Sequence, residues 1–230
     1  MGKKDFSEAI EACKENGERL CYDAESCWSS PAGVALAILA QEEFAKAFML
    51  NLVNEGIIPW SQGVQWSIRN HECKHLFVLI MDYLVSIDEP FDEWHKRLKS
   101  GEQVQIPSHV CDAISIYRHE KVGRWEEGPP CWVEDPNWHK IPKNIGMKKK
   151  VDRKKQDSLY VQISKDGKVV KVPDADEKDV EKELKQARDI QDIASGHVLN
   201  AFSHYWEIQN ILKWVFSEPE DSQDNQELVI

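Results

Sequence analysis

The chain of 230 residues is 41% hydrophobic and 30% charged, contains nine Trp, and has a formal net charge of −11 at pH 7. A chain of this length and apolar content can bury a core of its own, which excludes a largely disordered protein. The acidic balance argues against a protein that coats nucleic acid without regard to its structure.

Export and membrane insertion are not expected from the sequence. The N-terminal residues are polar and amphipathic, so we expect no secretory signal. The longest apolar run, residues 34–40, is too short to span a bilayer. Six Cys occur without a CxxC pair, and a reducing compartment would keep them as thiols instead of a disulfide or zinc framework. These features predict a cytoplasmic protein without membrane contact.

Charge is distributed unevenly along the chain. Residues 139–155 contain eight Lys and Arg against one Asp, a net charge of +7, while the remainder carries −18. Such a segment is typical either of a site that binds nucleic-acid phosphates or of a flexible, solvated loop, and both alternatives stay open. The acidic residues 218–230 are predicted to be a disordered tail. The candidate phosphate-binding residues are Lys148, Lys149, Lys150, Arg153, Lys154 and Lys155.

The fold class expected from the sequence is mainly α, a helical bundle that forms a single domain over residues 1–217. Apolar residues recur at helical spacing, and Gly and Pro mark the ends of the helices. The third of these helices is apolar on two sides, which predicts that it is central or that it packs against both its own bundle and a second subunit. The predicted helices cover residues 6–28, 31–55, 60–86, 92–98 and 107–122.

The second half of the chain is predicted to leave the bundle and return. An irregular insertion covers about residues 88–157, which are rich in Trp, Pro and charge. A β-hairpin follows at about residues 158–172, with Asp166-Gly167 at its turn. A long C-terminal helix then carries an apolar seam from Val180 to Val215. It would measure about 60 Å, so we expect a kink at Gly196 or a contact with another subunit.

A carboxylate lies within the apolar stripe of the second helix. On an ideal helix Glu42 falls between apolar positions, where a charge is unfavourable unless it is paired. Lys46, four residues on, is its nearest expected partner, and Glu43 lies one step around. The alternative is an ion pair at the edge of the surface, with the side-chain stems partly buried.

The third helix contains the densest polar cluster, residues 69–75. Arg69 offers a permanent charge for a phosphate, and His71 and His75 can transfer protons near neutral pH. The alternative is that these are core residues with ordinary partners. Because one apolar side of this helix would otherwise be exposed, we also expect a homodimer. Its predicted interface consists of Val64, Ile68, His75 and Leu79.

Two motifs resemble those of AbiV-type abortive-infection proteins. Residues 36–46, LAILAQEEFAK, resemble the family's ILAxEExxK helix, and His71-Glu-Cys-Lys74 resembles its HxxK motif. The hairpin, Pro173 and the closing helix follow the same layout, so the resemblance spans about residues 32–211. It implies an HEPN-like helical bundle, in which an Arg and a His a few residues apart cleave RNA without a metal in a dimer. Arg69 and His75, with five residues between them, match that spacing.

The leading hypothesis is a metal-independent endoribonuclease toxin of phage defence that needs no cofactor. Arg69 would hold the scissile phosphate, Asn70 would orient it, and His75, with His71 beside it, would transfer protons. On an ideal helix Arg69 and His75 lie about 120° apart, so convergence requires a distorted helix or a second subunit. The predicted partners are RNA, a second copy of the chain, and a phage protein or an antitoxin. The surrounding polar shell is Glu42, Glu43, Lys46 and Lys74.

Two alternatives belong to other functional classes. The first is a non-catalytic interaction protein that senses a phage protein or blocks translation, with the polar cluster as a buried specificity network. The second is a di-metal carboxylate bundle, because Glu72 and His75 have ExxH spacing and Glu42 offers a second carboxylate. The second ExxH that such a site requires is missing, which makes the metal hypothesis the weaker one.

Overall fold

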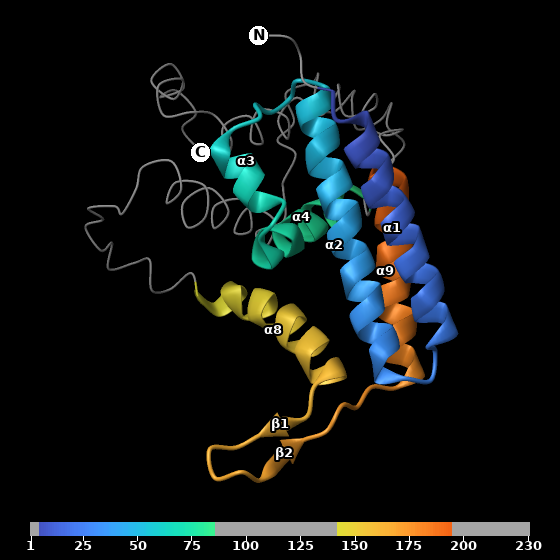
Figure 1. Cartoon of the computed structure of the whole chain (residues 1–230), viewed down its shortest axis with the longest axis vertical. Helices are drawn as coiled ribbons and strands as arrows, with labels where there is room; N and C mark the ends of the chain where they lie inside the picture. The colour runs from blue at the N-terminus through green and yellow to red at the C-terminus, as the bar shows by residue number, and fades with distance from the viewer. Residues whose placement is uncertain (1–4, 86–141, 195–230) are drawn as a thin grey trace, which may run out of the picture.

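The structure is a computed structural model that describes residues 5–85 and 142–194. The helices α1, α2 and α9 lie side by side as a bundle, and α4 and α8 contact α2 from another side (Figure 1). The described elements are α1 (Ser7–Ser26), α2 (Pro31–Asn54), α3 (Gln62–Ser67), α4 (His71–Val85), α8 (Pro142–Leu159), β1 (Gln162–Ile163), β2 (Val169–Lys171) and α9 (Glu177–Ala194). The mainly helical fold with a small hairpin is therefore confirmed.

Helix α2 is the centre of the described fold. Its start is set by Ser30, whose hydroxyl accepts a hydrogen bond from the Ala32 amide, and by Pro31 in the first turn. It contacts α1, α4, α8 and α9, and side chains on every side of it are buried. The prediction that the third helix would be central was wrong, because the frequent Ala residues of α2 let neighbouring helices approach it from all directions. Its largest buried side chains are Ile38, Phe44, Phe48, Met49 and Leu52.

The single helix predicted over residues 60–86 is two helices. Ser61 caps α3 by accepting from the Val64 amide at 3.3 Å, and Asn70 caps α4 by accepting from the Cys73 amide at 3.2 Å. Both residues have short polar side chains that compete for backbone donors, so each favours a helix start over a helix interior. Arg69 lies in the turn between the two helices.

The α3–α4 face predicted to form a dimer interface is covered by its own chain. Val64 and His75 are buried, and Ile68 and Leu79 are partly buried against the same core. The two-helix arrangement accounts for this burial, since α4 packs against α2 and the short α3 packs against α4. Within the described residues, this face is thus largely covered by the chain itself, and Ile68 and Leu79 keep only part of their surface exposed.

Helix α8 replaces part of the predicted irregular insertion. Residues 142–159 are helical, whereas residues 88–141 lie outside the described residues. The inward side of α8 contains Val151, Lys155 and Ser158, spaced four and three residues apart. Two of these three residues are polar, so hydrophobic periodicity could not reveal the helix. The solvated-loop alternative for the basic segment is wrong for residues 142–155.

The hairpin is confirmed, with shorter strands than predicted. Residues 162–163 pair antiparallel with residues 169–171, and Gly167 takes a φ of +78°, as the predicted turn requires. Helix α9 confirms the start of the C-terminal seam through buried Val180 and Leu184. Among the described helices none is long and apolar enough to cross a membrane. Predicted features outside the described residues are the helices over 92–98 and 107–122, the seam beyond residue 194 and the tail 218–230.

Gly17 lets α1 approach α2 closely, and its substitution should destabilise the bundle. A Cβ at this position would lie 2.6 Å from Cε1 of the fully buried Phe44 ring. We expect Gly17→Ala to lower the free energy of unfolding by about 1–3 kcal/mol, as overpacking of a core does. Chemical denaturation measures this difference. The exposed Glu15 on the same helix is the control, and a Gly17→Ala change no larger than that of Glu15→Ala would contradict the close packing.

Candidate functional site

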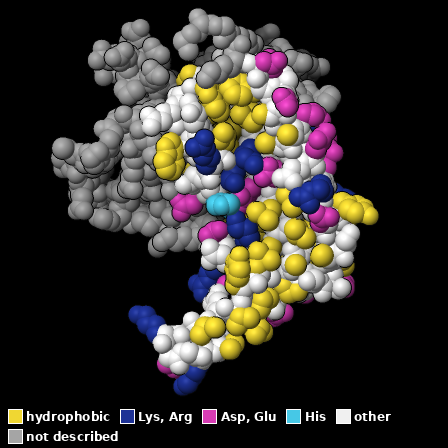
Figure 2. Space-filling view, in the orientation of Figure 1, with side chains coloured by type: hydrophobic (Ala, Val, Ile, Leu, Met, Phe, Trp, Pro, Cys, Tyr) yellow, Lys and Arg dark blue, Asp and Glu magenta, His cyan; other side chains and the backbone are white. Residues whose placement is uncertain are grey.

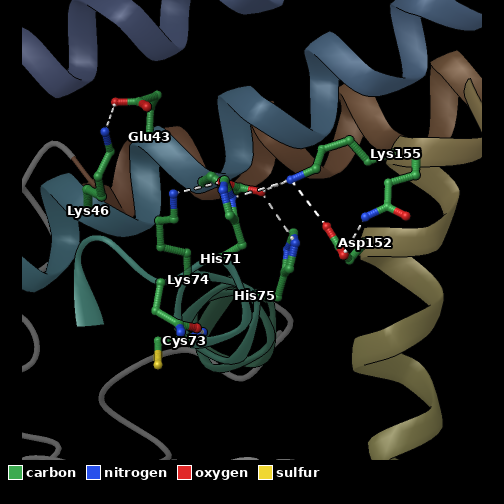
Figure 3. A network of polar contacts seen from close by, with 11 residues as sticks. Glu43, Lys46, His71, Cys73, Lys74, His75, Asp152 and Lys155 are labelled. Atoms are coloured by element: carbon green, nitrogen blue, oxygen red, sulfur yellow. Dashed lines mark hydrogen bonds and ion pairs between the residues drawn. The ribbon is translucent and has the colours of Figure 1, made fainter. Parts of the chain in front are cut away.

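The buried carboxylate of Glu42 is the centre of the polar site. The side chain is 1% exposed and projects from α2 toward α4 and α8. His71, Lys74 and His75 of α4 point toward α2, and Lys155 approaches from α8 (Figure 3). The spacing of three and four residues places the three α4 side chains on the same side of that helix. Three helices therefore contribute to one site.

Both oxygens of the Glu42 carboxylate have charged partners. Oε1 is 2.7 Å from Nζ of Lys155, and Oε2 is 2.7 Å from Nζ of Lys74. Nδ1 of His71 is 2.5 Å from Oε2. Asp152 approaches from outside, with Oδ1 3.5 Å from Nζ of Lys155. The two ammonium groups thus share the charge of two carboxylates, which makes the buried arrangement electrically balanced.

Glu42 is ionised over the whole physiological pH range. Burial alone would raise the pKa of this carboxyl, but the hydrogen bonds from Lys155 and Lys74 outweigh it and lower the pKa to about 2. The carboxylate is therefore a permanent acceptor. The Nδ1–H group of His71 donates a hydrogen bond to this carboxylate, and Nε2 is the ring nitrogen left for other partners.

His71 and His75 lie in different environments. The His71 side chain is 55% exposed, whereas that of His75 is 4% exposed. Burial lowers the pKa of His75 to about 4, although the nearby Glu42 opposes the shift. Nε2 of His75 is 3.4 Å from Oε1 of Glu42, yet among the described residues it has no hydrogen-bond partner. His75 is thus neutral near pH 7, and His71 is the one that faces solvent.

Arg69 and Asn70 immediately precede the first residue of α4. Asn70 caps α4 and thereby fixes the backbone of His71, the first residue of that helix. Arg69 is exposed in the preceding turn. The 120° separation of Arg69 and His75 expected on an ideal helix does not apply here, because the helix begins only after Arg69. The break places an exposed Arg two residues before the exposed His71.

The prediction that Lys46 is the partner of Glu42 was wrong. Lys46 pairs with Glu43, its Nζ 2.5 Å from Oε2, and both residues are partly exposed. Glu42 itself points away from this pair, toward α4 and α8. Sequence reasoning considered only partners on the same helix, while the observed cations come from elsewhere in the chain. Glu43 and Lys46 therefore lie beside the site and not within it.

The basic segment contributes to the site through α8. Lys155 was predicted as an RNA-binding residue, and the structure places it in the Glu42 cluster. Lys154 pairs with Asp179 at 2.7 Å and Glu183 at 3.0 Å of α9, and Arg153 is exposed. Lys148, Lys149 and Lys150 lie in the same helix. Sequence reasoning missed Asp152, whose only signal was its position as the one acid within the basic run.

The donor set of the site disfavours the di-metal hypothesis. Lys74 and Lys155 already occupy the two oxygens of Glu42 that the hypothesis would assign to metal ions. Ammonium groups at this distance also repel a divalent cation. Among the described residues, no group of three or more His, Cys, Asp and Glu could hold a metal ion.

A comparison with known protein families identifies the family to which this chain belongs. The model of the HEPN family AbiV matches residues 5–192. The chain belongs to the AbiV family. No curated protein and no solved structure matches it. AbiV proteins are abortive-infection proteins of the HEPN type, and this chain shares that membership.

The match to AbiV covers every helix of the site. Residues 5–192 include α2, α4 and α8 together with the hairpin. On the surface of this AbiV chain a histidine lies among Lys, Arg and acidic side chains (Figure 2). His71 is the exposed one of the two described histidines. The site thus combines a closed network around Glu42 with one ring that solvent can reach.

Removing Glu42 should destabilise the protein far more than removing Glu43. Glu42→Ala leaves Lys74 and Lys155 without their buried counter-charge, which typically costs about 3–5 kcal/mol. Glu43→Ala breaks one partly exposed pair with Lys46, worth about 0–1 kcal/mol. Urea unfolding of both variants measures the difference. Equal midpoints would show that the Glu42 cluster does not stabilise the fold.

Stability should fall progressively as the pH is lowered from neutrality. The pKa of His75 is lowered from 6.5 to about 4, so the unfolded chain binds its proton first and unfolding is favoured below about pH 6.5. The pKa of Glu42 is lowered from 4.5 to about 2, so its contribution is lost between those values. Melting temperatures at successive pH values record both steps. His75→Gln should flatten the dependence between pH 6.5 and 4, and an unchanged slope would refute the His75 assignment.

Proposed function

We propose that this AbiV chain is a metal-independent endoribonuclease of phage defence, with His71 as its proton-transferring group. The observation that supports this proposal is the exposed His71 ring, which is hydrogen-bonded at 2.5 Å to the buried, permanently ionised Glu42. A carboxylate that orients a histidine and fixes its tautomer is a common arrangement for general acid–base catalysis. The proposed substrate is RNA, because a histidine can activate its 2′-hydroxyl.

The proposed reaction is an attack of the 2′-oxygen on the adjacent phosphorus. A general base removes the 2′-hydroxyl proton, the new O–P bond forms, and the bond from phosphorus to the 5′-oxygen breaks. A general acid then protonates that oxygen, which leaves a 2′,3′-cyclic phosphate and a 5′-hydroxyl. Nε2 of His71 can serve either proton transfer, and the exposed Arg69 can stabilise the charge on the phosphate oxygens. Neither role needs a metal or a cofactor.

The other residues of the site would support His71 and Arg69. Asn70 holds the first turn of α4 and so positions His71. Lys74 and Lys155 keep Glu42 ionised. His75 stays a candidate for proton transfer because of its spacing from Arg69, but its buried, neutral ring favours a positioning role. Lys148, Lys149, Lys150 and Arg153 are the proposed contacts for the RNA backbone further along α8.

The proposal extends to the setting of the reaction. Two copies of the chain would form the active species in the cytoplasm, with an interface other than the α3–α4 face. A phage protein or an antitoxin would control the activity, as expected for an abortive-infection protein.

His71→Ala and Arg69→Ala should each abolish RNA cleavage and cellular toxicity. Loss of a general acid or base typically lowers a rate by about 10²- to 10⁴-fold, and both side chains are exposed, so the fold should be retained. Cleavage of labelled RNA by the purified protein measures the rate, and EDTA should leave the wild-type rate unchanged. His75→Gln is the matched comparison, with a smaller expected loss.

Two results would change the assignment. A loss in His75→Gln as large as that in His71→Ala, with the fold intact, would move proton transfer to His75. Folded His71→Ala and Arg69→Ala proteins that still protect cells as the wild type does would refute the ribonuclease.

A non-catalytic interaction protein is the second candidate. The observation that favours it is the closure of the network, since Lys74, His75 and Lys155 are all buried and contact Glu42. Such a network can specify a fold without performing chemistry. In that case wild-type protein would not cleave RNA at any concentration, while substitutions on its surface would abolish protection against phage.

A further inference from the structure

Exposed hydrophobic side chains gather on the β1–β2 hairpin. The described residues include ten large hydrophobic side chains that are exposed, and seven of them lie within residues 159–172. Hydrophobic side chains cover much of the hairpin in the surface view (Figure 2). A contiguous apolar patch on a protruding element is typical of an interaction surface. The seven are Leu159, Tyr160, Val161, Ile163, Val169, Val170 and Val172.

Both faces of the hairpin are open. Val169 and Val170 are neighbours on β2 and therefore point to opposite faces, yet they are 63% and 65% exposed. The described sheet consists of β1 and β2 alone. Two strands of two and three residues are marginal in water without further packing. The hairpin therefore lacks, within the described chain, the cover that its composition calls for.

Charge indicates what kind of surface could cover the hairpin. The basic arm, residues 142–173, contains ten Lys and Arg against three Asp, a net charge of +7, and the remaining residues carry −18. Helix α1 alone has six acidic residues against two basic ones. The positive arm of one copy can therefore attract the negative helix α1 of a second copy.

Helix α1 also offers apolar side chains for the hairpin to contact. Tyr22 is 70% exposed, and Trp28, just after the helix, is 37% exposed. Both lie near the turn between α1 and α2, at the same end of the bundle from which the hairpin projects (Figure 1). In a dimer with a two-fold axis, the hairpin of each copy can therefore contact the C-terminal end of α1 in the other copy. The same contact then occurs twice.

We propose that the β1–β2 hairpin docks on the C-terminal end of α1 in a second copy of this chain. The apolar hairpin residues cover Tyr22 and Trp28, and Lys165 and Lys168 beside the hairpin turn face the net negative charge of α1. Lys171 stays paired with Asp157 of its own chain. This interface is independent of the ribonuclease proposal and differs from the α3–α4 face predicted from the sequence.

Light scattering of the full chain at micromolar concentration tests the dimer. We expect a mass twice the 26.6 kDa of the chain. Two variants remove apolar contacts from the two sides of the interface, namely Ile163→Ser with Val170→Ser in the hairpin, and Tyr22→Ser on α1. Each should raise the dimer dissociation constant at least about tenfold, as loss of central apolar contacts does.

Trp66→Ser is the matched control, because Trp66 is 51% exposed on α3, outside both surfaces. It should leave the dissociation constant unchanged. A monomeric wild type would overturn the proposal, and so would hairpin variants that dimerise as tightly as the wild type.

Hydrogen exchange of the unmodified chain gives a second test that does not depend on the folding of a variant. Amides of residues 162–171 should exchange more slowly at high protein concentration than at low concentration, because association buries them. Exchange rates in the hairpin that are independent of concentration would contradict the proposed interface.

Discussion

The buried charge of Glu42 is the constraint on which the described architecture depends. A carboxylate with 1% exposure is unfavourable unless cations and hydrogen bonds surround it. Lys74 supplies one cation from α4, and Lys155 supplies the other from α8. Neither helix can move away from α2 without leaving a buried charge unpaired. The requirement of one side chain thus fixes the relative positions of three helices and assembles the candidate site.

Neighbouring lysines give α8 a second attachment. Lys155 reaches α2, while Lys154 binds Asp179 and Glu183 of α9. Glu183 is itself buried and accepts a hydrogen bond from the side chain of Gln41 in α2. Part of the positive charge that suggested a nucleic-acid site is therefore used within the fold. Arg153, between Asp152 and Lys154, is exposed.

The break between α3 and α4 gives the candidate site its chemistry. In a continuous helix, Arg69 and His71 would be interior residues with their backbones hydrogen-bonded on both sides. The cap formed by Asn70 instead begins a new helix at His71 and leaves Arg69 in an exposed turn. One histidine therefore becomes accessible while remaining bonded to Glu42, and the other is buried. The same motif thus contains one exposed and one buried histidine, both next to Glu42.

The sequence alone determined the class of fold and the ends of α1 and α2, because caps, proline and helical periodicity are local signals. It also determined the hairpin turn at Gly167 and the unusual burial of Glu42, and its motifs pointed to the AbiV family. Tertiary structure decided which cations neutralise Glu42. Lys155 is 113 residues away along the chain, and no local pattern encodes a contact over that separation. It also decided that α8 is a helix, since its buried side is partly polar and is stabilised by ion pairs that form only when α2 and α9 are in place.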